Sequence, residues 1–186
     1  MNPAEVFRQI TNALNLAGIS YMLTGSFASA HYGVPRSTQD IDIVIEATDA
    51  QLRNFIRSLD HTRYYAELDT ALEAHRRESL FNVIDTETGW KIDLIIRKGR
   101  PFSREEFGRR QLVQELSVFV ASSEDVIVAK LEWAKLGGSQ RQIEDAAAIM
   151  RIQADTLDKS YLEKWIRELE LSDQWTLARR SAEMSN

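Results

Sequence analysis

The run Asp40-Ile41-Asp42-Ile43-Val44-Ile45 constrains the fold of this chain more than any other segment. Acidic and apolar residues alternate at its start, and its second half is wholly apolar. Because successive side chains of a β-strand point to opposite faces, this pattern predicts a buried strand with one polar end. We therefore expect the chain to be built around a β-sheet.

The surrounding sequence alternates between helical and strand patterns. Helices are expected over 3–17, 27–32 and 48–60, strands over 19–24, 40–45, 80–84, 90–96 and 116–120, and a hairpin turn over 85–89. Residues 61–78 have a weak pattern with room for one short helix, and a capping box at Ser103 predicts another helix start. The predicted fold class is α/β (α+β), a small mixed sheet of about five strands with packed helices.

After residue 121 the sequence pattern becomes wholly helical. Ser122 and the pair Gly137-Gly138 are start and stop signals for one helix, and three more helical segments follow. The chain is therefore predicted to comprise an α/β domain over 1–121 and a C-terminal helical subdomain over 122–186.

Composition excludes several classes of function. The 186 residues include 23 basic and 28 acidic ones, and this net charge of -5 argues against a general nucleic-acid binder. There is no cysteine, so disulfides, thiolate metal sites and cysteine nucleophiles are excluded. The N-terminus lacks the pattern of a signal peptide and no run of 18 apolar residues occurs, so a cytoplasmic protein without a membrane partner is expected.

Three carboxylates are the candidate metal ligands. Asp40 and Asp42 lie on one face of their strand, about 6.6 to 6.8 Å apart along its axis, and such a pair repels itself unless a cation is present. Asp93 has a matching alternation and completes a two-ion site if its strand is a neighbour. Mg²⁺ prefers carboxylates, water and phosphate oxygens, and two such ions promote in-line displacement at phosphorus.

A glycine-serine turn provides a candidate phosphate site. Gly25-Ser26 joins a predicted strand to a helix, which places backbone N–H groups and a hydroxyl at a helix N-terminus. Arg36, Ser37 and Thr38 add a cation and two hydroxyls just before the acidic strand.

The order of strand, Gly25-Ser26, short helix, Asp40-Ile41-Asp42 and a later strand with Asp93 resembles the polymerase-beta-type nucleotidyltransferase superfamily, in particular its small, minimal bacterial members. Thr24 before the glycine is a slight departure, because the family has an apolar residue there. The resemblance implies that the three aspartates bind two Mg²⁺ ions and catalyse nucleotidyl transfer, with Asp93 helping to deprotonate an acceptor hydroxyl. It also implies a nucleoside triphosphate donor, here expected to be ATP, whose phosphates contact Gly25 and Ser26.

The C-terminal region looks like the helical extension of bacterial relatives, some of them from toxin–antitoxin or phage-defence loci. Lys130, within an otherwise apolar helical face, is either a charge aimed at bound nucleotide or a lysine whose ammonium reaches solvent. The acceptor is open: family members modify proteins, RNA ends and small molecules. A small helical protein partner is a further expectation of this resemblance.

Simpler interpretations remain for individual residues. The aspartates are also consistent with solvated strand ends, and Asp93 with a solvent-facing carboxylate paired with Lys91. Arg36 is either a phosphate contact or a solvated loop residue. The basic run from Arg97 to Arg110 is either a site for a polyanionic acceptor such as tRNA or a solvated loop.

Two other functions use the same residues. A catalytically degenerate protein of this fold would bind a partner as an antitoxin-like component. A nuclease or phosphodiesterase would use the same metal ions with water as the nucleophile, and the Gly25-Ser26 turn favours a triphosphate substrate over this alternative.

Overall fold

The computed structural model of the chain describes residues 3–35, 37–114 and 117–184. The described residues form two compact units. Those of the first, the sheet unit, fall within Met1–Thr24 and Ser37–Val120, and those of the second, the helical unit, fall within Gly25–Arg36 and Ala121–Asn186. Each unit is described by itself.

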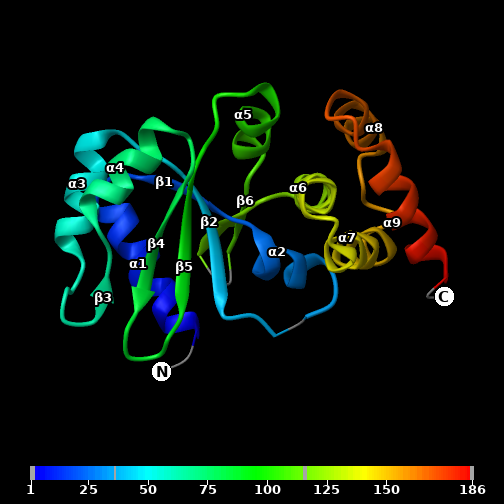
Figure 1. Cartoon of the computed structure of the whole chain (residues 1–186). Helices are drawn as coiled ribbons and strands as arrows, with labels where there is room; N and C mark the ends of the chain where they lie inside the picture. The colour runs from blue at the N-terminus through cyan, green and yellow to red at the C-terminus, as the bar shows by residue number, and fades with distance from the viewer. Residues whose placement is uncertain (1–2, 36, 115–116, 185–186) are drawn as a thin grey trace. The chain divides into compact units, whose positions relative to one another are not determined.

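The sheet unit is organised around a mixed sheet with the strand order β3-β4-β5-β2-β1-β7-β6 (Figure 1). Its strands are β1 (Ser20–Leu23), β2 (Asp40–Glu46), β3 (Tyr64–Tyr65), β4 (Leu80–Asp85), β5 (Lys91–Ile96), β6 (Gln111–Val113) and β7 (Val118–Val120). β2 is parallel to β5 and β1 is parallel to β7, whereas the other neighbouring pairs are antiparallel. Its helices are α1 (Pro3–Leu16), α3 (Asp49–Ser58), α4 (Leu68–Arg76) and α5 (Pro101–Gly108).

One face of the sheet is covered by α1, α3 and α4 (Figure 1). Every second residue of β2, β4 and β5 points to this face and is buried, as the alternation of a half-buried strand requires. The apolar residues of this set are Ile41, Ile43, Ile45, Phe81, Val83, Ile92, Leu94 and Ile96. The residues between them point to the opposite face, here called the open face, where several are polar.

Local sequence signals predicted most of these elements. The hairpin β4–β5, the helix in 61–78 (α4) and the capping box of α3, in which Thr48 and Gln51 bond to each other's backbone, are confirmed. The expectation of about five strands is wrong, because the sheet has seven within the described residues. β3 and β6 were missed since two or three residues are too short to establish a period of two.

Among the boundaries that differ from the sequence-based prediction, two are the starts of α5 and β7. Helix α5 begins at Pro101 with Arg100 as its N-cap, and Ser103 accepts a hydrogen bond from the Arg100 side chain instead of capping the helix. Proline fits the first turn, where a missing N–H removes no helical hydrogen bond. The predicted strand at 116–120 is β7, which begins at Val118, and Leu116 lies outside the described residues.

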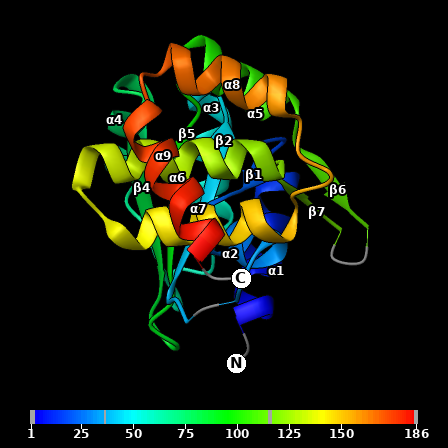
Figure 2. The same ribbon diagram turned by 90° about the vertical axis from the view of Figure 1, so that its right-hand side faces the viewer.

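The helical unit consists of α2 (Gly25–Tyr32), α6 (Ser123–Gly137), α7 (Gln140–Ile152), α8 (Lys159–Glu168) and α9 (Ser172–Met184). Figure 2 shows α6 and α7 side by side, with α9 against α7. The Ser122 hydroxyl caps α6 by accepting from the Asp125 amide, as predicted, and Gly138 ends it in the left-handed region. Helix α2 packs with α6 and α7, whereas the sequence-based prediction placed its residues in the domain 1–121.

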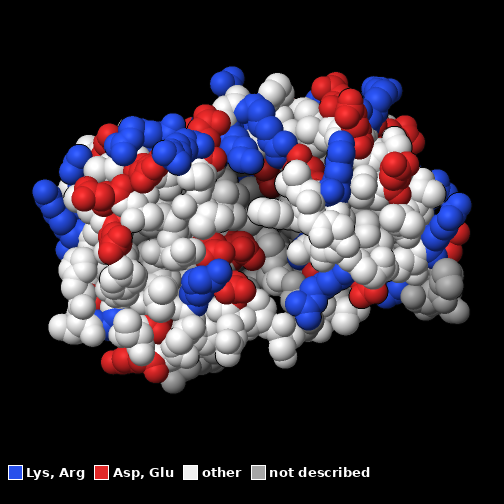
Figure 3. Space-filling model, in the orientation of Figure 1, with Lys and Arg blue, Asp and Glu red and all other residues white. Residues whose placement is uncertain are grey.

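Charged side chains are dispersed over the surface. On the face drawn in Figure 3, lysines and arginines alternate with aspartates and glutamates. Among the described residues, none of the helices has the length and apolar character needed to cross a membrane.

Candidate functional site

Three carboxylates lie on the open face of the sheet unit, near the start of β2 and β5. These strands are parallel, and their register pairs Asp40 with Lys91 and Asp42 with Asp93. β4 extends the second of these rows, because Asn82 pairs with Asp93. Directly paired residues point to the same face, so both rows project from the same side of the sheet. The condition that the sequence analysis placed on Asp93, that its strand is a neighbour of β2, is met.

Lys91 joins the two strands through its ammonium group. The Nζ atom lies 3.3 Å from Oδ1 of Asp40 and 3.2 Å from Oδ2 of Asp93. Burial lowers the pKa of Lys91, but the hydrogen bonds and charges of Asp93 and Asp40 outweigh this effect and raise the pKa above its ordinary value. Lys91 is therefore a cation among these carboxylates at neutral pH.

Asp93 is the most enclosed member of the Asp40–Lys91–Asp93 ion pairs. Its side chain is 14% exposed, compared with 52% for Asp40 and 41% for Lys91. The amide of Asn82 donates to Oδ1 of Asp93 over 2.6 Å, while Oδ2 faces Lys91. The pairing with Lys91 that sequence suggested is present, although Asp93 is mostly buried. Asn82 was missed, because only the pairing of β4 with β5 brings it to Asp93.

The donors of this cluster suit a magnesium ion in kind, because carboxylate oxygens are the protein ligands that Mg²⁺ prefers. The Lys91 ammonium shows that oxygens from Asp40 and Asp93 converge on one cation. In their present rotamers these residues form an ion-pair cluster. Within 3–35, 37–114 and 117–184, no three His, Cys, Asp or Glu side chains are grouped as a metal site. The residues fit Mg²⁺ in chemistry and strand placement, and side-chain rotation is needed to bind it.

Gly25 and Ser26 form the junction between β1 and α2. Gly25 has φ +62°, a conformation that a side chain would strain, so glycine allows the strand to turn directly into the helix. The amide of Thr24 donates to the carbonyl of Asp42 over 2.9 Å, so β1 ends beside Asp42 in the sheet. Gly25 and Ser26 themselves belong to the helical unit, where Ser26 is buried.

The loop before β2 contains two further predicted phosphate contacts. Ser37 is exposed in the sheet unit, and Arg36 lies outside the described residues. The hydroxyl of Thr38 accepts a hydrogen bond from the backbone amide of Asp40 over 3.2 Å. It also donates one to the carbonyl of Asp40 over 3.3 Å. This local turn fixes the start of the acidic strand.

Lys130 has a role within the helical unit that sequence did not suggest. Its ammonium donates to Oδ2 of Asp145 over 2.7 Å, and the two side chains are 5% and 12% exposed. Lys130 therefore neither reaches solvent nor stands alone. The pair joins α6 to α7.

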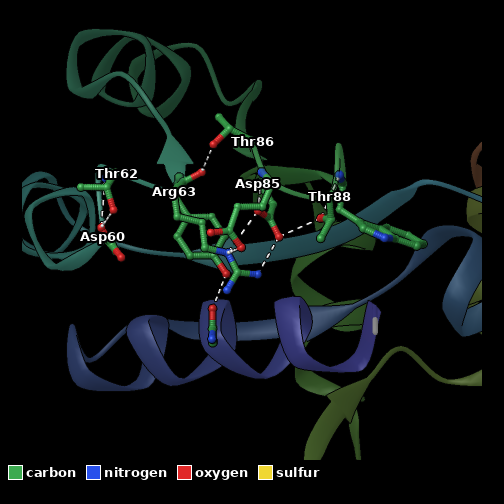
Figure 4. Close-up of polar contacts among 10 residues, drawn as sticks. Asp60, Thr62, Arg63, Asp85, Thr86 and Thr88 are labelled. Atoms are coloured by element: carbon green, nitrogen blue, oxygen red, sulfur yellow. Dashed lines mark hydrogen bonds and ion pairs between the residues drawn. The ribbon is translucent and has the colours of Figure 1, made fainter. Parts of the chain in front are cut away.

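An ion pair on the covered face anchors the hairpin that carries Asp93. The guanidinium of Arg63 donates two hydrogen bonds to the carboxylate of Asp85, over 3.1 Å and 2.7 Å (Figure 4). Thr88 also donates to Asp85, and Thr86 donates to the carbonyl of Arg63. The Arg63 hydrogen bond holds the pKa of Asp85 below its usual range, although burial acts in the opposite direction. The turn between β4 and β5 is thereby fixed.

Several residues of the basic run have partners inside the sheet unit. Arg97 pairs with Glu46, and Arg100 bonds to Ser103. The guanidinium of Arg110 lies 4.4 Å from the ring centroid of Phe107. These contacts favour a structural role for the run over a polyanion site.

Comparisons with known proteins identify the fold. No family model and no curated protein matches the sequence. The solution structure of the antibiotic-resistance factor ANT(2'')-Ia matches with a TM-score of 0.55 and 13% identity over 95% of each chain. A nucleotidyltransferase-like protein from Paracoccidioides brasiliensis matches with a TM-score of 0.53 and 14% identity, over 95% of this chain and 91% of that one. ANT(2'')-Ia with adenylyl-2''-tobramycin matches with a TM-score of 0.50 and 12% identity over 98% of each chain.

This likeness shows a nucleotidyltransferase-like fold. At such low identity it concerns the arrangement of helices and strands, and it does not extend to the activity of this chain. The resemblance noted from the sequence is supported at the level of the fold alone.

Proposed function

We propose that this chain is a Mg²⁺-dependent nucleotidyltransferase that moves a nucleoside monophosphate from a nucleoside triphosphate, with ATP favoured, to a hydroxyl acceptor. One observation carries the proposal: the parallel register of β2 and β5 sets Asp42 beside Asp93, with Asp40 on the same face. The shared fold with an adenylyl-transferring resistance factor supports it.

In the proposed reaction the acceptor oxygen attacks the α-phosphorus of the triphosphate. A new phosphorus–oxygen bond forms, the bond to the β-phosphate oxygen breaks, and pyrophosphate leaves with that electron pair. Asp93 helps to accept the hydroxyl proton. Asp40, Asp42 and Asp93 would hold two metal ions, which neutralise the charge that develops on the phosphate oxygens.

The triphosphate contacts are proposed on chemical grounds. The backbone N–H groups at Gly25 and the Ser26 hydroxyl begin α2, and the start of a helix favours phosphate. Arg36, Ser37 and Lys130 are assigned supporting phosphate contacts, and Lys130 would have to leave Asp145 to make one. The acceptor is a protein, an RNA end or a small molecule such as an aminoglycoside.

Calorimetric titration tests the proposal. Each of the four nucleoside triphosphates is added to the protein with and without Mg²⁺. We expect binding only with Mg²⁺, strongest for ATP, and lost in Asp42→Asn. Asp155→Asn, which removes an exposed carboxylate from the helical unit, is the matched control and should bind as wild type does. Absence of metal-dependent binding to all four nucleotides would refute the proposal.

The second candidate is a catalytically degenerate protein of the same fold that binds a small helical protein partner in an antitoxin-like role. It is favoured by the pairing of Lys91 with Asp40 and Asp93, since a permanent ammonium neutralises part of the acidic cluster without a metal. An acidic cluster that binds neither Mg²⁺ nor nucleotide would support this candidate.

A further inference from the structure

The position of Lys91 bears on how the proposed metal site is filled. Its ammonium contacts one carboxylate oxygen on each strand, Oδ1 of Asp40 and Oδ2 of Asp93. These contacts use oxygens of two of the three carboxylates that the proposed function assigns to metal ions. The lysine and the metal therefore need the same oxygens.

The contacts of Asp93 favour this overlap. Its Oδ1 atom accepts a hydrogen bond from the Asn82 amide over 2.6 Å, whereas its Oδ2 atom faces Lys91. That oxygen is 3.2 Å from Lys91. A metal ion that binds Asp93 here must displace the ammonium or bind beside a like charge, which costs free energy.

Displacement is feasible because Lys91 is a flexible side chain near the surface. The Lys91 side chain is 41% exposed and that of Asp40 is 52% exposed. Ion pairs with this exposure contribute little stability. A lysine stem with four rotatable bonds allows the ammonium to move into water. A divalent ion with its higher charge then has the advantage in electrostatic attraction.

We propose that Lys91 is a tethered cation that occupies the carboxylate cluster until a divalent metal ion displaces it. The inference rests on the proposed function, because it concerns the same metal site. Lys91 offsets the negative charge of Asp40 and Asp93 in the absence of metal, and it lowers the affinity of the site for Mg²⁺. Metal occupancy then responds to the Mg²⁺ concentration instead of being saturated at all times.

The test is a calorimetric titration of Mg²⁺ into wild type and Lys91→Met, which keeps most of the stem and removes the charge. Removing one unit charge a few ångströms from a divalent ion should tighten binding by about tenfold. Lys98→Met makes the same change of net charge at an exposed position after β5 and should leave the affinity unchanged. Lys91→Arg keeps the charge and should bind no more tightly than wild type.

The outcomes separate the two proposals. Tighter binding in Lys91→Met alone, or binding in this variant where wild type shows none, supports the inference. Equal or weaker binding in a folded Lys91→Met, with wild type binding Mg²⁺, overturns the inference and leaves the proposed function standing. An absence of Mg²⁺ binding in wild type and in every folded variant overturns both.

Discussion

Strands β4 and β5 carry two ion-pair clusters, one on each face of the sheet, and the two differ in almost every physical respect. On the covered face Asp85 is fully buried, and both of its carboxylate oxygens accept hydrogen bonds from Arg63. The carboxylate also accepts a hydrogen bond from a threonine hydroxyl. On the open face Asp93 and Asp40 share one ammonium, that of Lys91, and Asp40 is half exposed.

This difference separates a structural cluster from the proposed cation site. A buried carboxylate whose oxygens are all hydrogen-bonded has no acceptor site left for a ligand. Removing its charged partner lowers the stability of the fold strongly. Asp40 and Asp93 share a single ammonium at a place where Asp40 and Lys91 are partly exposed, so a cation can reach them. The Arg63–Asp85 pair is therefore expected to contribute stability, and the open-face aspartates are the proposed site of cation binding.

The largest expected effect is on the covered face. Asp85→Asn removes the charge that compensates Arg63 and should lower the free energy of unfolding by about 3 kcal/mol. Chemical denaturation measures this. Glu87→Gln is the matched control, because Glu87 pairs with the same arginine at 3.6 Å but is 60% exposed. Glu87→Gln should lower the free energy of unfolding by under about 0.5 kcal/mol. Equal losses in the two variants would contradict the claim that burial makes the Asp85 pair the more stabilising one.

Low pH should remove the stabilisation that the Arg63–Asp85 pair contributes. Because Arg63 lowers the pKa of Asp85 in the folded state, this contribution is fully present above the ordinary value of 3.8 and is lost as the pH falls through the lower, folded pKa. The stability difference between wild type and Asp85→Asn should therefore be constant near neutral pH and shrink below about pH 4. Denaturation curves across this range measure it, and a difference that grows in acid would reverse the sign.

On the open face, Asp42→Asn should abolish function without unfolding the protein. We expect nucleotide affinity in the presence of Mg²⁺ to fall by at least about 100-fold, because loss of a metal ligand exceeds the loss of an outer partner. The melting temperature should change little, since Asp42 is not fully buried. If Asp42→Asn lost stability but kept nucleotide binding, the open-face cluster would be structural, which would contradict this account.

A smaller effect is expected at Asn82, which positions Asp93 and is not assigned as a ligand. Asn82→Ala frees one oxygen of Asp93 and should weaken Mg²⁺ binding by about tenfold. Calorimetry with Mg²⁺ measures the change. An unchanged affinity would mean that β4 contributes nothing to the site beyond its place in the sheet.

Local patterns in the sequence were enough to predict the longer strands and to place the three aspartates on two of them. The alternation of Asp40 and Asp42 with isoleucines identifies β2, and the same alternation around Asp93 identifies β5. What the sequence lacked was the strand order. That β5 lies directly against β2, in the register Asp42 to Asp93, depends on pairings between segments about fifty residues apart.

The residues that sequence analysis missed depend on such distant contacts. Arg63 meets Asp85 through the pairing of β3 with β4, and β3 is only two residues long. Lys130 appeared to be an isolated charge, because Asp145 is on the next helix. Neither partnership leaves a periodic signal along the chain.

The most direct measurement of the central claim is the binding of Mn²⁺, a paramagnetic substitute for Mg²⁺, followed by the electron paramagnetic resonance signal of the unbound ion. Our account predicts that wild type removes this signal and that Asp42→Asn does not, while Glu87→Gln behaves as wild type. Equal binding in wild type and Asp42→Asn, or none in either, would contradict a cation site on the open face of the sheet.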